Sequence, residues 1–279
     1  MQLNRPVALL LLAACAATAA DTKTDGSDAI HHAFVRLYNF DFPGTHAILD
    51  RRLAEAPTDS MAYAVRASAY LFSELYRLRI LEAEFLSDDD RIIDKKKEKP
   101  DQNLKKAMMD ALELARRSAY NRLAKQPRDS EALFTLCVVS GVETDYAALV
   151  EKRQWGSLSY AKQSQKYAAR LLSQDPTYYD AYLTSGVSEY LLGSIPFFLR
   201  WFIRFDQVQG SKQKAIENLE LVGRSGRYLK PFAKILLAII YIREKQPRKS
   251  EAMLREYARD YPENPLIRHE LALLDAKRR

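Results

Sequence analysis

The stretch LAEAPTD at residues 53–59 returns in altered form as LAKQPRD at 123–129, LSQDPTY at 172–178 and ARDYPEN at 258–264. Proline cannot continue a helix, and an Asp, Asn or Ser shortly after it can cap the next one. Helical periodicity dominates the sequence from about residue 29 onward, without sustained two-residue alternation. Each stretch therefore predicts a joint at which one helix stops and the next begins.

A second pattern follows the first three joints. Alanine followed by Tyr or Leu stands five and six residues after the proline, and a small residue stands ten residues after it. The small residues are Ala67, Cys137 and Gly186. Small side chains let two helices approach closely, while the larger ones fill the space between them. The pattern predicts that helices stack on one another in a regular way.

This spacing resembles the tetratricopeptide repeat (TPR), a helical hairpin of about 34 residues with small residues in both helices and proline at its exit. The resemblance covers about residues 45–275, although the prolines lie 70, 49 and 86 residues apart. It implies an all-α fold, a right-handed superhelix of helix hairpins over residues 29–279, with insertions near 87–102 and 191–211. A plain helical bundle is the alternative architecture.

Composition excludes several classes of function. Only 9 of the 279 residues are glycine, which argues against sandwiches, barrels and glycine-rich nucleotide folds. Two cysteines cannot form a disulfide scaffold or a four-cysteine zinc site. GxSxG, HExxH and phosphate-binding glycine loops are absent from the sequence, and its four histidines lack metal-ligand spacing. We therefore predict a protein that is not an enzyme and holds no cofactor or metal.

The first twenty residues have the layout of a secretory signal peptide. Arg5 gives a basic start, residues 7–14 form an apolar run, and small residues follow as far as Ala20. The run is too short to span a bilayer, and we expect no later segment to be long enough either. The sequence predicts an exported chain in which residues 21–28 form a polar tether.

Two cleavage sites compete within this leader. Thr18-Ala19-Ala20 suits an ordinary signal peptidase, whereas LAAC at 12–15 looks like a bacterial lipobox that would leave Cys15 lipidated at the mature N-terminus. The predicted location is therefore the periplasm, either soluble or lipid-anchored to the outer membrane. The second cysteine, Cys137, is predicted to be a buried, small apolar residue.

The second insertion contains an aromatic run, SIPFFLRWFIRF at 194–205. One interpretation is an interfacial anchor, with rings at the headgroup boundary of a membrane and arginines on phosphates. The other is a helix that lies across the superhelix and closes its groove, because so long an exposed aromatic stretch invites aggregation. The residues concerned are Phe197, Phe198, Arg200, Trp201 and Arg204.

The TPR resemblance also implies a binding groove, because in that family the first helix of each hairpin lines a concave surface. The corresponding positions here are Ala64, Ser68, Leu71, Phe134, Val138, Leu183, Val187, Tyr190, Phe232, Ile235 and Ile239. They lack the Lys, Arg and Asn that grip a terminal carboxylate. Such an apolar groove would fit an amphipathic helix or a greasy small ligand. Alternatively, these residues are simply the core of a tightly wound stack.

These features together predict a non-enzymatic protein–protein interaction scaffold of the bacterial cell envelope. Its partners would be envelope proteins, with membrane contact through a lipid anchor. The formal net charge of +7 is a mild basic excess, which suits anionic envelope surfaces better than nucleic acid. The alternative function is a periplasmic helical-repeat lipoprotein that binds a hydrophobic small ligand for a transporter.

Overall fold

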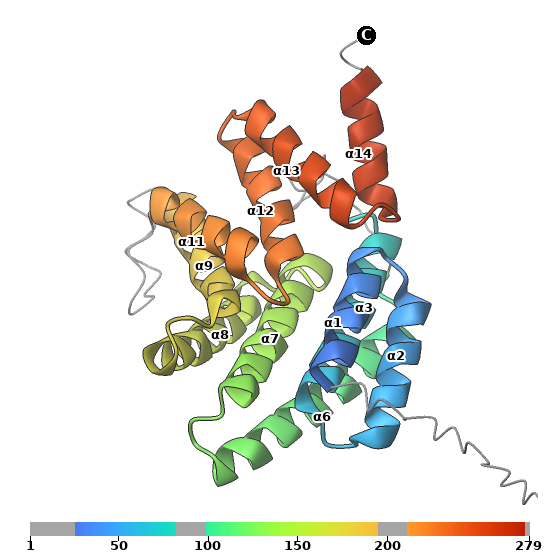
Figure 1. Ribbon diagram of the computed structural model, residues 1–279, viewed down its shortest axis with the longest axis vertical. Helices are drawn as coiled ribbons and strands as arrows, with labels where there is room; N and C mark the ends of the chain where they lie inside the picture. Colours follow the sequence, from blue (N-terminus) through green and yellow to red (C-terminus); the bar gives the residue numbers. More distant parts are fainter. Residues whose placement is uncertain (1–25, 82–98, 195–210, 277–279) are drawn as a thin grey trace, which may run out of the picture.

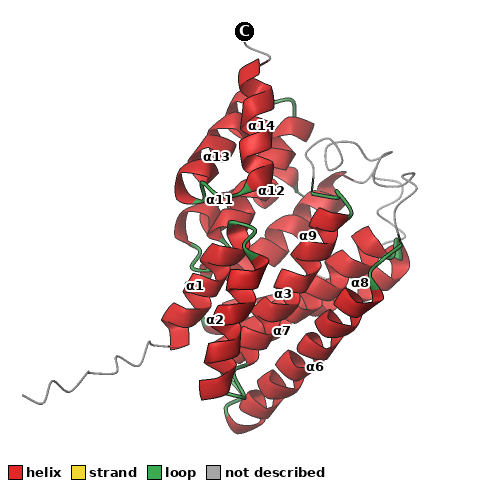
Figure 2. Cartoon of the chain, turned by 90° about the vertical axis from the view of Figure 1, so that its right-hand side faces the viewer, coloured by secondary structure: helices red, strands yellow, loops and turns green. Residues whose placement is uncertain are grey.

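A computed structural model describes residues 26–81, 99–194 and 211–276, and every regular element within these ranges is helical (Figures 1 and 2). The helices are α1 (Gly26–Tyr38), α2 (Phe42–Glu55), α3 (Ser60–Arg77), α6 (Gln102–Lys125), α7 (Ser130–Asp145), α8 (Gln154–Gln174), α9 (Tyr182–Ser194), α11 (Lys212–Ser225), α12 (Lys230–Arg243), α13 (Pro247–Asp260) and α14 (Pro265–Ala276). A π-helical turn (Tyr146–Val150) extends α7, and a 3-10 turn (Tyr179–Ala181) precedes α9.

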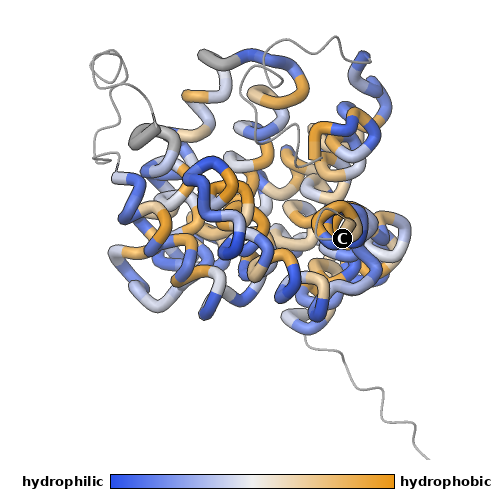
Figure 3. The backbone as a smooth tube through the Cα atoms, turned by 90° about the horizontal axis from the view of Figure 1, so that it is seen from above, coloured by the Kyte–Doolittle hydropathy of each residue, from blue (hydrophilic) through white to orange (hydrophobic). Residues whose placement is uncertain are grey.

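Consecutive helices pack as hairpins. α1 packs on α2, α3 on α6, α7 on α8, α9 on α11 and α12 on α13, and α14 follows as a single helix on α13. Hairpins also pack on each other, since α3 contacts both α1 and α2 and α7 contacts both α3 and α6. Hydrophobic and hydrophilic residues alternate along the helices (Figure 3), as amphipathic helices in a stack require. The predicted all-α, TPR-like stack of helix hairpins is confirmed.

The first two joints have the same hydrogen bonds. Asp59 caps α3 by accepting the backbone N–H three residues further on at 3.0 Å, and it receives Arg52 Nε–H at 2.7 Å. Asp129 caps α7 in the same way at 2.9 Å and receives Arg122 Nε–H at 2.9 Å. The repeated motif is thus a capping aspartate held by an arginine from the preceding helix, which ties successive helices together.

The later joints differ from one another. At the fourth, Asn264 caps α14, accepting two backbone N–H groups at 3.0 and 3.1 Å. At the third, Tyr178 stands at the capping position and cannot cap. Asp180, 3% exposed, instead accepts the backbone N–H groups of residues 227–229 at 2.9, 3.1 and 2.7 Å. This carboxylate therefore ties one joint to the turn that begins α12.

Small residues stand where helices approach most closely. Ala67 and Cys137 are buried, as the repeat pattern predicted. At Gly186 a Cβ atom would lie 2.8 Å from Cγ of Leu219, so α9 and α11 approach at a distance that only glycine allows without a shift. The prediction that position ten after the proline permits close packing is confirmed at these positions.

Buried glutamates hold the helices that follow the two predicted insertions. Glu74 of α3 accepts the backbone N–H of Asp101, the residue that caps α6, at 2.9 Å. Glu189 of α9 accepts the backbone N–H of Ser211, the residue that caps α11, at 3.0 Å. The two hairpins with long insertions therefore close through the same kind of contact, a buried carboxylate on an N-cap amide.

Element boundaries differ from the predicted ones by a few residues. α1 begins at Gly26, so residues 26–28 of the predicted tether are helical. Residues 191–194 of the second predicted insertion complete α9, and Gln102 of the first begins α6. Residues 87–98 and 195–210 of these insertions lie outside the described ranges.

The length and hydropathy of α7 and the turn that follows it contradict one expectation from the sequence. Ser130–Val150 is long and apolar enough to cross a membrane by length and composition, with a mean hydropathy of 1.5. The expectation that no segment after the leader reaches this length was therefore wrong. Because 67% of this window is buried inside the protein, its apolar character has an explanation in core packing.

Candidate functional site

The predicted groove positions lie on the first helices of their hairpins, but many face a packed interior. Ala64, Leu71 and Phe134 are 0%, 1% and 0% exposed, and Ser68 and Tyr190 are also buried. The others are half-buried, namely Val138, Leu183, Val187, Phe232, Ile235 and Ile239. The buried side chains have almost no surface for a ligand in this arrangement. A binding role for the half-buried ones stays a prediction.

Aromatic rings from distant parts of the chain fill this interior. Tyr228, just before α12, stacks on Phe34 of α1 and on Phe134 of α7, with ring centroids 5.2 and 6.2 Å apart. Phe72 of α3 meets Phe232 of α12 edge-on at 5.8 Å. The stack thus curves until its first and later hairpins touch, and these rings occupy the space that an open superhelix would leave for a ligand.

Hydrogen bonds join the first helix to the C-terminal turns. The Tyr38 carbonyl accepts the Tyr257 hydroxyl and the Asn264 side-chain amide, both at 2.8 Å. The Tyr38 hydroxyl donates to the Tyr228 carbonyl at 2.9 Å. Burial raises the pKa of both phenols, so they remain protonated donors. These bonds fix the two ends of the described stack to each other.

Histidine and carboxylate side chains do not gather into a metal site within the described ranges, where no three His, Cys, Asp or Glu residues form a group. His31 and His32 are exposed, with ring centroids 6.2 Å apart. His46 is half-buried, its ring 4.5 Å from that of Tyr70, and burial lowers its pKa. His269 is exposed on α14. These positions match surface and packing roles.

Cys137 is a buried free thiol, as predicted. Its Sγ lies 3.1 Å from the Thr184 hydroxyl and 3.4 Å from the Ser164 hydroxyl. Burial raises the pKa of this thiol, which disfavours the reactive thiolate. The prediction that Cys137 is a packing residue is confirmed.

One carboxyl group has a strongly perturbed pKa. Asp145 ends α7, where the backbone enters the π-helical turn, and its side chain makes no hydrogen bond or ion pair with other described residues. Burial raises the pKa of Asp145 to about 7. Burial is the only cause of this shift, so no neighbouring charge among the described residues contributes to it.

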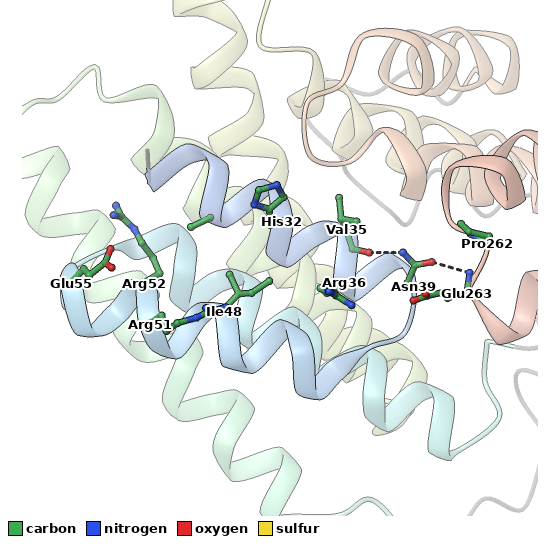
Figure 4. Close-up of a pocket in the computed structure, with 11 residues that line it drawn as sticks. His32, Val35, Arg36, Asn39, Ile48, Arg51, Arg52, Glu55, Pro262 and Glu263 are labelled. Carbon is green, nitrogen blue, oxygen red and sulfur yellow. Dashed lines mark hydrogen bonds between the residues drawn. The ribbon is translucent and has the colours of Figure 1, made fainter. Parts of the chain in front are cut away.

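A surface groove with a volume of about 640 Å³ lies between α1 and α2 (Figure 4). The residues of α1 that line it alternate with the buried residues of this helix, so the groove lies on the exposed side of α1. Its lining residues are Ala29, His32, Val35, Arg36, Asn39, Ile48, Arg51, Arg52, Glu55, Pro262 and Glu263. The sequence analysis did not identify this groove.

Arginines dominate the polar lining of this α1–α2 groove. Arg36 gives one N–H to Asp41 at 3.2 Å, and Arg52 gives Nε–H to Asp59 at 2.7 Å. Arg51 is exposed and makes no ion pair or hydrogen bond with other described residues. A guanidinium carries five N–H donors, and the described residues accept only a few of those that the groove arginines offer.

The ends and the floor of the groove differ from its arginine lining. Glu55 lies at one end and Glu263 at the other (Figure 4). Val35 and Ile48, both half-buried, supply apolar surface between the two helices. The groove therefore combines an apolar floor with cations in its middle and carboxylates at its ends.

A second surface pocket of about 620 Å³ lies where the joints come together. Its lining residues are Gly26, Ser27, Arg52, Ala56, Thr58, Asp59, Arg122, Ser130, Glu131, Tyr178, Arg227 and Tyr228. Arg122 binds Asp129 at 2.9 Å and Glu131 at 2.8 Å, and Arg52 binds Asp59. Its charges are largely paired within the protein, so this pocket is the weaker candidate for a binding site.

Two sets of predicted functional residues lie outside the described ranges. These are Cys15, predicted as a lipidation site, and Phe197, Phe198, Arg200, Trp201 and Arg204, predicted as a membrane anchor or a plug. Both stay predictions.

Comparison with known proteins assigns no activity to the chain. No protein-family model matches the chain, and no curated protein matches its sequence. Among solved structures, it is similar to a thermophilic TPR protein of Thermus thermophilus. The TM-score is 0.45 at 15% identity, over 88% of this chain and 97% of that one. By its own hairpins and joints, the chain is a TPR-like helical-repeat protein.

Proposed function

We propose that this chain is a non-enzymatic interaction module of a bacterial cell envelope. The observation that carries the proposal is the stack of helix hairpins, because repeated hairpins present extended, rigid surfaces to other proteins. The leader-like layout of the first twenty residues supports export.

Partner binding is assigned to the outside of the stack. Rings such as Phe34, Phe134 and Tyr228 fill the interior, and hydrogen bonds to Tyr38 hold the stack closed. The α1–α2 groove, in contrast, lies at the surface and is lined by arginines with N–H donors that no described residue accepts. It is therefore the best-formed candidate for an interaction surface among the described residues.

Anchoring to the outer membrane through Cys15 is part of the proposal. The LAAC stretch at 12–15 supports lipidation at this cysteine. The polar residues between Cys15 and α1 would then separate the helical stack from the membrane.

The alternative, a lipoprotein that binds a hydrophobic small ligand for a transporter, has less support. Its predicted apolar positions lie largely in the packed interior, and charged side chains contribute much of the lining of both surface pockets. A hydrophobic ligand prefers a mostly apolar cavity with a few polar groups.

Native mass spectrometry of the full chain, extracted gently from the envelope of its own host, tests the proposal. We expect a stoichiometric complex with a second protein. A bare polypeptide from repeated preparations would contradict the interaction role, and a small non-covalent adduct would favour the alternative.

A Cys15→Ala variant tests the anchor in the same preparation. The unsubstituted protein should carry the added mass of a diacylglycerol and an acyl group, and the variant should lose it and leave the membrane fraction. Equal masses for both mature proteins, after allowance for the substitution, would contradict lipidation.

A further inference from the structure

Among the described residues, the first hairpin is covered on one side and open on the other. α3 packs on both α1 and α2 from one side. On the other side, the turn before α14 touches one corner, where the Glu263 backbone N–H donates to the Asn39 side-chain oxygen at 3.1 Å. The rest of that side is the α1–α2 groove (Figure 4). The stack could therefore accept one more helix at this place.

The shape of the groove suits a helix. A short connection makes α1 and α2 an antiparallel hairpin, and two such helices leave a depression between them that a third helix can fill. α3 fills the corresponding depression on the covered side. Lining residues run along α1 from Ala29 to Arg36, and Asn39 follows just after its end, so the lining extends for about 15 Å. Val35 and Ile48 give the apolar floor that an amphipathic helix needs.

The charges of the groove select for carboxylates. Arg51 is exposed without a partner among the described residues, and Arg36 is more than half exposed although it binds Asp41. Guanidinium groups match the planar, two-oxygen geometry of carboxylates and bind them in pairs of N–H donors. Glu55 and Glu263 at the two ends would repel acidic groups there, so the acidic residues of a ligand are expected opposite the middle.

We infer that the α1–α2 groove docks an amphipathic helix of a partner protein, which carries Glu or Asp opposite Arg36 and Arg51 and apolar residues opposite Val35 and Ile48. This inference rests on the proposed function and adds the chemistry of the partner. The docked helix extends the stack beyond α1.

A membrane surface fits the groove less well. The groove is recessed between two helices, whereas interfacial binding inserts protruding apolar side chains into the headgroup region. None of the large hydrophobic residues exposed in the described ranges lies on α1 or α2. A protruding helix reaches the recessed floor, and a flat lipid surface does not.

A designed peptide probe tests the inference on the full mature chain. The probe is a fluorescein-labelled amphipathic peptide of about 15 residues, slightly longer than the groove, with one leucine face flanked by glutamates. The control probe carries lysine in place of each glutamate. We expect the glutamate peptide to bind at least about tenfold more tightly than the lysine peptide, measured by fluorescence anisotropy at low salt. Equal affinities would overturn the inference.

Two charge-reversal variants locate the site. Arg51→Glu should weaken binding of the glutamate peptide about tenfold, because it replaces attraction with repulsion in the lining of the groove. Arg117→Glu is the matched control, since Arg117 is also an exposed helical arginine without a partner among the described residues, but it lies on α6. It should change binding less than about twofold. Equal effects of both substitutions would overturn the inference, and circular dichroism checks that both variants are folded.

The same variants separate this inference from the proposed function. If the native envelope complex forms with the unsubstituted chain and is lost with Arg51→Glu alone, both are supported. If the complex persists with Arg51→Glu, the groove is not the site although the interaction role stands. If vesicles of anionic phospholipid bind the chain, lose binding with Arg51→Glu and compete with the glutamate peptide, the groove binds lipid and the helix inference fails.

Discussion

The interior of the stack and the α1–α2 groove are built from similar amphipathic helices, yet one is filled and the other is open. Inside, Tyr228 brings together rings of α1 and α7, and Tyr38 links α1 to the C-terminal turns. Outside, the first hairpin keeps a recessed apolar floor below exposed arginines. The repeat pattern in the sequence thus identifies which helices stack. The curvature of the whole stack decides which helix surfaces remain exposed to a partner.

The largest effect is expected from removing a ring that fills the interior. Phe134→Ala should lower the free energy of unfolding by about 4 kcal/mol, because it deletes a fully buried ring and leaves a cavity. Urea denaturation followed by circular dichroism measures the loss. Val138→Ala, a half-buried neighbour on α7, is the control and should cost about 1 kcal/mol. If Phe134→Ala lowers the free energy of unfolding by less than Val138→Ala does, the interior is open rather than filled.

The tie between the third joint and α12 comes next. Asp180→Ala should destabilise the protein by about 3 kcal/mol, because three buried or half-buried backbone N–H groups lose their acceptor. Asp175→Ala removes a carboxylate that accepts only local bonds within the same joint, so it should cost about 1 kcal/mol or less. Thermal unfolding at equal pH compares the two. Equal losses would contradict a special role for Asp180.

Ionisation of Asp145, at the end of α7, should lower the stability of the folded protein at neutral pH. Burial raises its pKa in the folded protein to about 7, above the ordinary 3.8, so the folded state prefers the protonated acid. Stability from this group is therefore greatest below pH 4 and falls as the pH rises toward 7. Asp145→Asn removes the cost of ionisation and should stabilise the protein by about 2 kcal/mol at pH 8, a value below the full linkage energy because the group keeps some solvent contact.

Unfolding of this variant at pH 5 and pH 8 checks the sign of the effect. The stabilisation should be clearly smaller at pH 5 than at pH 8. The same change in stability at both pH values would show that ionisation of Asp145 is not its cause.

The smallest effect on folding is expected in the α1–α2 groove. Arg51→Ala should change the free energy of unfolding by less than about 0.5 kcal/mol, because the side chain is exposed and makes no bond with other described residues. A loss comparable to that of Val138→Ala, measured in the same urea series, would mean that the groove residue supports the fold and is not free for a partner.

The joints could be predicted because their signals are local. A proline followed two residues later by Asp59, Asp129 or Asn264 contains both the stop of one helix and the cap of the next. At the third joint the same reasoning fails, because Tyr178 cannot cap and Asp180 bonds to a turn almost fifty residues away. Contacts at that separation leave no trace in a local pattern.

From the sequence, a filled interior was one of two alternatives for the apolar positions and the α1–α2 groove was not identified, because both depend on contacts between distant parts of the chain. Closure depends on Tyr38 meeting Tyr257 and Asn264, which lie more than two hundred residues further along the chain. A partial signal for the groove was present, since Ile48 and Arg51 stand one helical turn apart on α2, at the edge of the face that packs on the core. The sequence does not show whether another helix covers that side, so the signal alone indicates an ordinary solvated face.

The central claim is that the stack is closed, with α1 held against the C-terminal turns. Spin labels at exposed positions on α1 and α14, introduced as His31→Cys and Arg268→Cys with Cys137→Ser, test it by electron–electron double resonance. The account predicts one narrow distance distribution, which broadens when Asn264→Ala removes a bond to the Tyr38 carbonyl. A broad or divided distribution in the protein with Asn264 intact would contradict the account, because the ends would then separate and open the interior.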